Sequence, residues 1–160
     1  MKQGNPMPIE IRRAVPDDWA IIVEFNCRLA EESEGKKLDR AHVEPGVRAL
    51  LADARKGRYL VALSSGRVVG QLMHTYEWSD WRNGDIWWLQ SVYVHPEFRR
   101  QGVFRELFNQ LKSQAEADPG VVGLRLYVEE QNRRAHETYQ VLGLLPGGYF
   151  VMERMHRRSV

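Results

Sequence analysis

Two periods of apolar residues follow one another along the chain, and they predict an alternation of strands and helices. Residues 9–14 alternate apolar and polar side chains, which is typical of a strand with one buried face. Pro16 and two aspartates then open a helix, whose broad apolar face runs from Trp19 to Ala30. A second helical segment is predicted over residues 41–54.

The middle of the chain predicts three strands. Residues 58–78 predict a hairpin with its turn at Ser65 and Gly66. Residues 79–85, with the sequence SDWRNGD, predict a loop. Residues 86–94 are apolar at successive positions, so both faces of this strand should be buried at the centre of a sheet.

The C-terminal third continues the alternation. A helix is predicted over residues 102–117 and a strand over residues 121–128. Asn132 caps a short helix that ends at Gly143, and residues 149–155 predict a last strand. The complete order, β-α-α-β-β-β-α-β-α-β, predicts an α/β (α+β) fold in which helices flank a mixed sheet.

Size and composition restrict the class of protein. The 160 residues suffice for one domain with a real core, and we expect a single domain over residues 1–160. Cys27 is the only cysteine, which excludes a disulfide framework and is compatible with a reducing compartment. The N-terminal stretch MKQGNPMPIEI has no apolar run of signal-peptide length, and no segment approaches the roughly 20 apolar residues that span a bilayer. We therefore expect a cytoplasmic protein without a membrane partner.

Charge and histidine spacing remove two further classes. The formal net charge is only +2, so the whole chain gives no argument for a nucleic-acid partner. None of the five histidines forms a pair at a zinc-ligand spacing such as HExxH. We expect neither nucleic acid nor a metal.

The most informative stretch is VYVHPEFRRQGVFRELF, residues 92–108, which changes from strand to helix around Gly102. Arg99, Arg100 and Arg105 lie at the predicted start of the helix, where the helix dipole repels cations. The unpaired N–H groups at a helix start bind anions, and a bound phosphate would turn the arginines into ligands. The alternative is a solvated basic turn. The stretch is no P-loop, because GK[ST] is missing.

Two motifs in this region resemble those of a known family. RRQGVF resembles the Q/R-x-x-G-x-G/A signature of the GNAT superfamily of acyl-CoA N-acyltransferases, although Phe104 replaces the last small residue. LYVEEQNRRAHETYQVLGL is similar to the second motif of that family. EWSDWRN, with WWLQSVYV after it, also resembles a bacterial subgroup of the family.

The resemblance implies a GNAT fold, with a mixed sheet of six to seven strands and about four helices. It implies a gap between the fourth and fifth strands that holds acetyl-CoA as cosubstrate. Backbone amides from Gln101 to Arg105 would hold the diphosphate, and Asn132 would contact the pantetheine arm. The implied cofactor-binding set is Val92, Tyr93, Val94, Arg99, Arg100, Gln101, Gly102, Val103, Phe104, Arg105, Asn132 and Tyr139.

Four of these residues have simpler explanations. Asn132 caps a helix by its position, and this role alone would explain it. Tyr139 lies on the apolar face of that helix, so it could be an ordinary core tyrosine. Val92 and Val94 would belong to the strand core in any case.

Acylation of an amine by a thioester needs a group that protonates or hydrogen-bonds the leaving thiolate, and the Tyr139 hydroxyl can supply it. The general base is open. Gln90 stands where many relatives have a glutamate, and it cannot take a proton. Glu77 and Asp80 are the candidates, against an ordinary solvated loop; water could also relay the proton, or the amine could arrive neutral.

An aromatic stretch of the sequence suggests which residues could bind the acceptor. Trp87 and Trp88 point to opposite faces of their strand, so at least one should belong to the core. Trp78 and Trp81 could wall the acceptor, and aromatic faces beside acids favour a cationic amine. The alternative is a loop that packs its own tryptophans. The candidate substrate residues are Trp78, Trp81, Gln90 and Glu31.

Taken together, the sequence predicts an acyltransferase that moves the acetyl group of acetyl-CoA to a primary amine of a small cationic molecule. The amine would attack directly in a ternary complex. The alternatives are a protein lysine or N-terminal acetyltransferase and a non-catalytic CoA-binding module. We expect a monomer or a homodimer.

Overall fold

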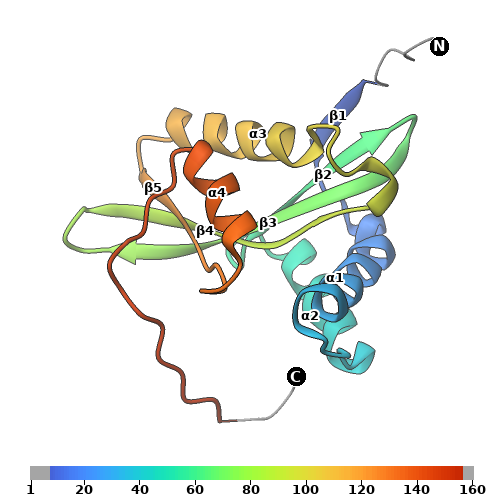
Figure 1. The fold of residues 1–160 in the computed structure, drawn as a ribbon, viewed down its shortest axis with the longest axis horizontal. Helices are drawn as coiled ribbons and strands as arrows, with labels where there is room; N and C mark the ends of the chain where they lie inside the picture. The colour runs from blue at the N-terminus through green and yellow to red at the C-terminus, as the bar shows by residue number, and fades with distance from the viewer. Residues whose placement is uncertain (1–7, 157–160) are drawn as a thin grey trace.

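The computed structural model describes residues 8–156, and it contains a five-stranded sheet in the order β1-β2-β3-β4-β5 (Figure 1). Residues 1–7, which carry most of the N-terminal stretch, and residues 157–160 lie outside the described residues, so the ends of the predicted domain do as well. The strands are β1 (Ile9–Arg13), β2 (Arg58–Ser64), β3 (Arg67–Ser79), β4 (Gly84–Val94) and β5 (Val121–Leu126).

Sequence-local turns determine most of the sheet. The β2–β3 hairpin turns at Ser65 and Gly66, whose φ angles of 49° and 76° match the twist of the flanking strands. β1 to β4 pair antiparallel, and β5 joins β4 in parallel after the helical crossover. β3 and β4 run on into a long hairpin, so the predicted loop at 79–85 shortens to a turn over residues 80–83.

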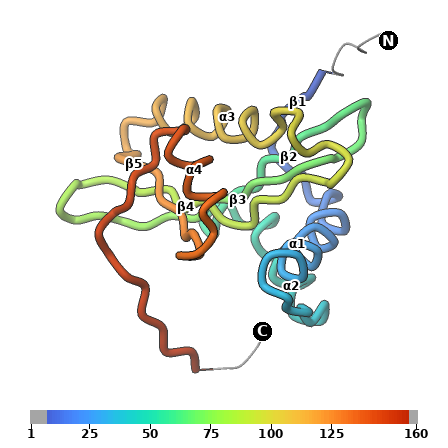
Figure 2. Tube along the Cα trace, viewed as in Figure 1, coloured from blue at the N-terminus to red at the C-terminus, as the bar shows by residue number. Residues whose placement is uncertain are grey.

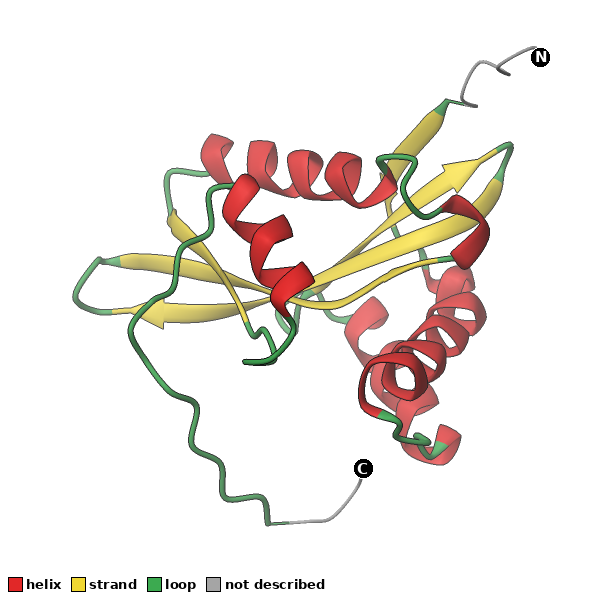
Figure 3. Ribbon diagram, in the orientation of Figure 1, coloured by secondary structure: helices red, strands yellow, loops and turns green. Residues whose placement is uncertain are grey.

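Within residues 8–156, four α-helices flank the sheet (Figure 3). The 3₁₀ turn η1 (Pro16–Asp18) leads into α1 (Trp19–Glu34), and α2 (Arg40–Ala52) packs beside α1. The second 3₁₀ turn, η2 (Pro96–Phe98), precedes α3 (Val103–Ala117), and α4 (Arg133–Val141) follows β5.

The two faces of the sheet are buried by different helices. Leu107, Phe108 and Leu111 of α3 pack on one face against Trp87 and Leu89 of β4. On the other face, α1 and α2 cover a second cluster of buried residues that includes Ile22, Val23, Val47, Tyr59 and Met73. Trp87 is therefore core, as expected for one tryptophan of the pair.

β4 carries a bulge next to its pairing with β5. Gln71 lies opposite Tyr93 and Met73 lies opposite Gln90, so two residues of β4 face one residue of β3. Ser91 has a φ of 50° at this point. The Gln71 amide donates to the Ser91 carbonyl at 3.1 Å, which holds the bulge from the buried side.

The pairing of β4 with β5 ends at the bulge. The last partners are Leu89 and Leu126, and no residue of β4 beyond Leu89 pairs with β5. The predicted gap between the fourth and fifth strands corresponds to this unpaired end of β4. α4 borders this gap, so the gap is not filled by solvent alone. Leu142 and Leu144, which follow α4, hold it in this position because they pack against the core cluster that includes α3.

The prediction of a last strand over 149–155 is wrong, and the sheet has five strands rather than six to seven. The segment that follows α4 runs away from the sheet without pairing to it (Figure 2). Aromatic and β-branched residues favour a strand, but a strand forms only where a second strand accepts its hydrogen bonds.

Candidate functional site

A cavity of about 510 Å³ opens beside the unpaired end of β4. Its walls come from α1, β4, the turn before α3, the first turn of α3, and α4. It brings together seven residues of the predicted cofactor set, namely Val92, Tyr93, Val94, Arg99, Phe104, Asn132 and Tyr139. These residues are distant in sequence, and only the tertiary fold places them on one cavity.

The start of α3 adjoins this cavity at Phe104. Gly102 precedes the helix with a φ of 84°, and Arg100 has a φ of 61°. The first intrahelical bond of this end joins the Glu106 N–H to the Gly102 carbonyl. In the described part of the chain no hydrogen bond uses the N–H groups of Val103, Phe104 or Arg105, so three donors point out of the helix end.

The three arginines around the start of α3 differ in their contacts. Arg99 donates to the Val94 carbonyl at 2.9 Å and pairs with Glu32 of α1 at 2.5 Å. Arg100 and Arg105 are exposed, and neither has an ion-pair partner among residues 8–156. Only Arg100 and Arg105 therefore keep an uncompensated charge beside the start of α3, while Arg99 ties the turn to α1.

Glu32 joins α1 to β4 at the rim of the cavity. Its carboxylate accepts from the Tyr93 hydroxyl at 2.8 Å as well as from Arg99. Burial acts to raise the pKa of Glu32, but the hydrogen bonds from Arg99 and Tyr93 outweigh it and leave the pKa below its ordinary value. Glu32 is therefore a fixed anion rather than a proton acceptor.

Asn132 and Tyr139 line the cavity from α4. The Asn132 side chain accepts from the Ala135 N–H at 3.1 Å, so its predicted capping role is confirmed. The Tyr139 ring packs edge-on against Phe104, with ring centroids 5.9 Å apart. Burial raises the pKa of Tyr139, so its hydroxyl keeps its proton at neutral pH and is a donor.

Glu77 does not line the cavity, and its carboxylate is already bound. Glu77 Oε2 accepts from the Trp88 indole N–H and from Arg125, the latter at 2.9 Å. The bond from Trp88, and after it the one from Arg125, lowers the pKa of Glu77. A lowered pKa makes this carboxylate a weaker base than a free glutamate.

The other acceptor residues lie on the β3–β4 hairpin or the end of α1, outside the cavity wall. Trp78 is 61% exposed and Trp81 is 87% exposed, so the hairpin does not pack these two rings on itself. Asp80 bonds the Trp81 N–H at the hairpin turn. The last two are Gln90, which donates to Thr75 Oγ1 at 2.7 Å, and the exposed Glu31.

Six residues of the cavity wall are absent from the sequence-based site, namely Leu29, Glu32, Ser33, Arg134, Ala135 and Thr138. Arg134, Ala135 and Thr138 lie inside the second motif, so helical spacing from Asn132 could have found them. Glu32 was expected only as one of several acids near the acceptor, and Leu29 and Ser33 gave no signal, because α1 meets β4 only through tertiary packing.

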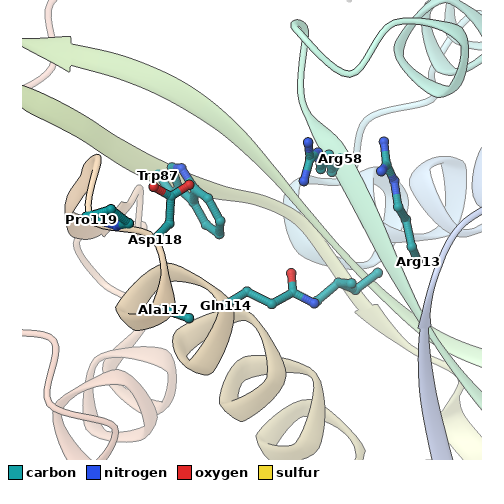
Figure 4. A pocket seen from close by; sticks show the side chains of 8 residues that line it. Arg13, Arg58, Trp87, Gln114, Ala117, Asp118 and Pro119 are labelled. Carbon is teal, nitrogen blue, oxygen red and sulfur yellow. The ribbon is translucent and has the colours of Figure 1, made fainter.

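A second cavity, of about 490 Å³, lies at the C-terminal end of α3 and contains none of the predicted site residues. Figure 4 shows Arg13 and Arg58 projecting from two neighbouring strands, with Trp87 and Asp118 across from them. The buried His74 stacks on Trp87 with ring centroids 4.2 Å apart. Burial, and after it the charges of Arg58 and Arg13, lowers the pKa of His74 to about 4, so its ring is neutral.

The sequence also matches a family model. The Acetyltransferase (GNAT) family model aligns with residues 21–144, which includes both motifs and every wall of the first cavity. The chain belongs to the GNAT family. Members of this family are acyltransferases that use acetyl-CoA, so the predicted enzyme class and the resemblance are confirmed at the level of the family.

Individual relatives agree with this membership. A bovine (Bos taurus) thialysine N-epsilon-acetyltransferase is 36% identical over 76 residues, which are 48% of this chain and 44% of that protein. The match therefore spans less than half the length of this curated relative. A pig (Sus scrofa) protein of the same name is 32% identical over the same shares.

A solved structure covers nearly the whole chain. A possible acetyltransferase from Clostridium difficile 630 is 49% identical, with a TM-score of 0.88, over 94% of this chain and 99% of that one. A ribosomal-protein-alanine N-acetyltransferase from Brucella melitensis biovar Abortus 2308 shares the fold, with a TM-score of 0.74, at 17% identity over 92% of this chain and 99% of that one.

Two features are absent from the described residues. No helix there has the length and apolar character to cross a membrane. No group of three or more histidine, cysteine, aspartate or glutamate side chains there is placed to hold a metal ion.

Proposed function

We propose that this GNAT protein transfers the acetyl group of acetyl-CoA to a primary amine of a small cationic molecule. One observation carries the proposal. The unpaired end of β4, Phe104 in the first turn of α3, and Asn132 and Tyr139 from α4 line one cavity of about 510 Å³.

The cavity walls fit the parts of acetyl-CoA. Diphosphate is an anion, and the first N–H groups of α3 with Arg100 and Arg105 supply donors and positive charge for it. The backbone of Val92 has no β5 partner, so it can pair with an extended pantetheine arm as a further strand would. Asn132, whose carbonyl oxygen caps α4, keeps its amide donors for the same arm.

Tyr139 is the proposed general acid. Acetyl-CoA supplies an activated thioester, and the acceptor amine attacks its carbonyl carbon. The Tyr139 hydroxyl, which burial keeps protonated, then hydrogen-bonds or protonates the departing sulfur. Packing against Phe104 already fixes the ring before substrate binds, so the reaction does not have to lose further side-chain entropy to position the hydroxyl.

The acceptor is proposed to be attracted by the β3–β4 hairpin before its amine enters the cavity, whose wall does not include the tip of the hairpin. Exposed Trp78 and Trp81 offer aromatic faces, and Asp80 adds negative charge next to them. The bovine relative is named for acetylation of the epsilon nitrogen of thialysine, an amine, and it supports an amine acceptor here. Glu77 is held by Trp88 and Arg125, and Asp80 lies in the turn at the far end of β4, eight residues or roughly 26 Å from Val92. A water molecule is therefore the better candidate for removing the amine proton.

The test is acetyl-CoA turnover across a panel of amines, with free thiol release as the readout. The panel contains small cationic amines, neutral amines of the same size, and peptides with a free N-terminus or an internal lysine. We expect the highest kcat/KM with a small cationic amine. A higher kcat/KM with a peptide would instead support a protein lysine or N-terminal acetyltransferase. Binding of acetyl-CoA without turnover on any amine would support a non-catalytic CoA-binding module.

A further inference from the structure

A network of three polar side chains, Gln71, Asn26 and Tyr59, lies behind the bulge of β4, on the face of the sheet that α1 covers. It begins at Gln71 of β3, whose side chain is fully buried. Gln71 Nε2 donates to the Ser91 carbonyl at 3.1 Å and to Asn26 Oδ1 at 2.7 Å. Asn26 Nδ2, on α1, donates in turn to the hydroxyl of Tyr59 on β2 at 3.1 Å. Side chains from three elements therefore support one backbone carbonyl of a fourth, β4.

The polar network has a fixed direction. Both neighbours of the Gln71 amide group, the Ser91 carbonyl and Asn26 Oδ1, are acceptors, so the amide must present its NH₂ group to them. Gln71 Oε1 is then buried without a hydrogen-bond partner among the residues that the structure describes. An unpaired buried oxygen costs free energy, so the two donated bonds together must outweigh that cost. The arrangement indicates that Gln71 serves as a donor to the bulge.

Ser91 requires this support because its backbone is strained. Its φ of 50° lies in the left-handed region, which residues other than glycine rarely adopt. Such a conformation persists only where the surrounding structure holds it. Gln71 holds the Ser91 carbonyl, and the Ser91 side chain also interacts with Tyr59. Burial raises the pKa of Tyr59, and hydrogen bonds with Asn26 and the Ser91 side chain act against this rise. Both ends of the polar network therefore act on the bulged residue.

The held carbonyl determines where the next N–H points. In a trans peptide the carbonyl of one residue and the N–H of the following residue point in opposite directions, and the described residues contain no cis peptide. The Ser91 carbonyl is held from β3, so the Val92 N–H points to the side of β5.

A second hydrogen bond gives the same direction. The His95 N–H donates to the Val69 carbonyl of β3 at 2.9 Å. Because successive N–H groups of a strand point to opposite sides, the N–H of Val92, three residues earlier, points away from β3. At this position β4 has no β5 partner, and Val92 lines the first cavity. The Val92 N–H is therefore directed to the side of β4 on which acetyl-CoA is proposed to bind.

We propose that Gln71, supported by Asn26 and Tyr59, is a positioning residue that aims the Val92 N–H at the thioester carbonyl oxygen of bound acetyl-CoA. This inference rests on the proposed function and adds the side chains that set its geometry. When the amine nitrogen bonds to the carbonyl carbon, the π electron pair moves onto the oxygen, and it returns as the carbon–sulfur bond breaks. An N–H that is already aimed at the oxygen stabilises this transient charge without reorganisation.

Gln71 itself does not line the cavity, so its loss should change the chemical step rather than binding. Gln71→Met keeps nearly the same side-chain length in a buried site but donates no hydrogen bond. We expect kcat to fall about 10- to 100-fold, with the Kd for acetyl-CoA within about twofold of the parent value. Steady-state kinetics and titration calorimetry measure the two quantities.

The matched control is Tyr76→Phe. It removes another bond from a β3 side chain to a backbone carbonyl, that of Ala54 at 3.0 Å, and should keep the parent kcat. A Gln71→Met enzyme with kcat within about twofold of the parent would overturn the proposal. An equal loss of kcat in Tyr76→Phe would also overturn it, because the loss would then follow from stability alone.

Two further variants remove outer members of the polar network. Asn26→Leu removes the group that orients the Gln71 amide, and Tyr59→Phe removes only the hydroxyl at the far end. The loss of kcat should therefore decrease in the order Gln71, Asn26, Tyr59. These variants also decide the case if Gln71→Met does not fold: full kcat in both would overturn the proposal, and a graded loss would support it.

Nuclear magnetic resonance of the Val92 amide tests the direction of the N–H without turnover. Acetyl-CoA carries the thioester carbonyl and CoA does not, so the difference between their two complexes isolates the bond to that oxygen. We expect the Val92 amide proton to lie further downfield with acetyl-CoA than with CoA. The difference should disappear in Gln71→Met and remain in Tyr76→Phe. Absence of turnover on any amine would refute the proposed function alone, whereas equal Val92 shifts in the two parent complexes would overturn the positioning role.

Discussion

The Arg99 guanidinium and the Glu32 carboxylate form an ion pair at 2.5 Å that joins the turn before α3 to the last turns of α1. Arg99 also holds the Val94 carbonyl, and Glu32 also holds the Tyr93 hydroxyl. The pair therefore fixes the distance between the two walls of the first cavity. It also gives Arg99 a structural role that Arg100 and Arg105 do not share.

The first prediction is that replacing Arg99 and replacing Arg105 have different effects on stability and on acetyl-CoA binding. Arg99→Ala should lower the free energy of unfolding by up to about 1 kcal/mol, the usual range for a partly exposed ion pair. Arg105→Ala should leave the free energy of unfolding unchanged and weaken acetyl-CoA binding about tenfold, since it removes a charge beside the start of α3.

Urea denaturation and titration calorimetry measure the two effects. Lys112→Ala, on the same helix but paired with Glu116 one turn further on, is the matched control and should change neither quantity. Arg105 would not be a ligand if its variant bound acetyl-CoA as tightly as the control does.

Gly102 is the second prediction. Its φ of 84° strains any other residue, and a side chain there would meet the Arg105 guanidinium, 3.3 Å from the position of its Cβ. Gly102→Glu should abolish acetyl-CoA binding, because it adds bulk and a repelling carboxylate at the proposed diphosphate site. Gly66→Glu has the same backbone strain, with φ 76° and open space, and should lose stability but keep binding. Unchanged affinity in folded Gly102→Glu protein would rule out the site.

Tyr139 is the third prediction. Tyr139→Phe keeps the ring against Phe104, so the fold and acetyl-CoA binding should survive. The value of kcat should fall by roughly 10²- to 10⁴-fold, or slightly less where water substitutes. Burial raises the pKa of Tyr139, so the hydroxyl of the parent enzyme stays protonated over most of the pH range. Deprotonation of this hydroxyl should therefore reduce kcat of the parent enzyme only at strongly alkaline pH.

Steady-state kinetics between neutral and alkaline pH test this role. The exposed Tyr127→Phe serves as the control for loss of a hydroxyl and should retain full kcat. A Tyr139→Phe enzyme with kcat within about twofold of the parent would contradict the general-acid role.

The acceptor side is the fourth prediction. Asp80→Asn should raise KM for a cationic amine more than KM for acetyl-CoA, because it removes charge beside Trp78 and Trp81. Glu77→Gln should instead lower stability, since the Trp88 indole and Arg125 lose a charged partner. Initial-rate kinetics with both substrates varied separate the cases. An equal change in both KM values, or none, would move the acceptor site elsewhere.

Acid stability is the fifth prediction, and it concerns Asp18 at the start of α1. Burial acts to raise the pKa of Asp18, but the Arg12 guanidinium at 2.7 Å and the Val15 N–H outweigh it and hold the pKa below its ordinary value. A lowered pKa means that the folded state binds the proton less readily than the unfolded chain. The stabilisation is therefore complete above pH ~4 and is lost as the pH falls through the lower folded value.

Denaturation at pH 7 and at pH 3 measures this contribution. Asp18→Asn should cost about 1–3 kcal/mol at pH 7, and its deficit relative to the parent should shrink at pH 3. The neighbouring exposed Asp17→Asn is the control and should cost little at either pH. A deficit in Asp18→Asn that is the same at both pH values would show that the ion pair does not titrate as described.

The sequence determined the elements whose signals are local. Periodicity and capping residues predicted the four helices and the first five strands, because hydrogen bonds inside a helix and tight hairpin turns depend on residues close in sequence. The glycine and arginines before α3 and the capping Asn132 were identifiable for the same reason. The two motifs also identified the family.

Only the tertiary structure decided how distant segments meet. It brought Glu32 of α1 to Arg99, placed Phe104 against Tyr139, and bound Glu77 to Arg125, none of which has a signal in local spacing. It also left residues 149–155 outside the sheet, although their composition favours a strand. The reason is physical: a strand exists only with a partner for its backbone, and composition does not state where that partner lies.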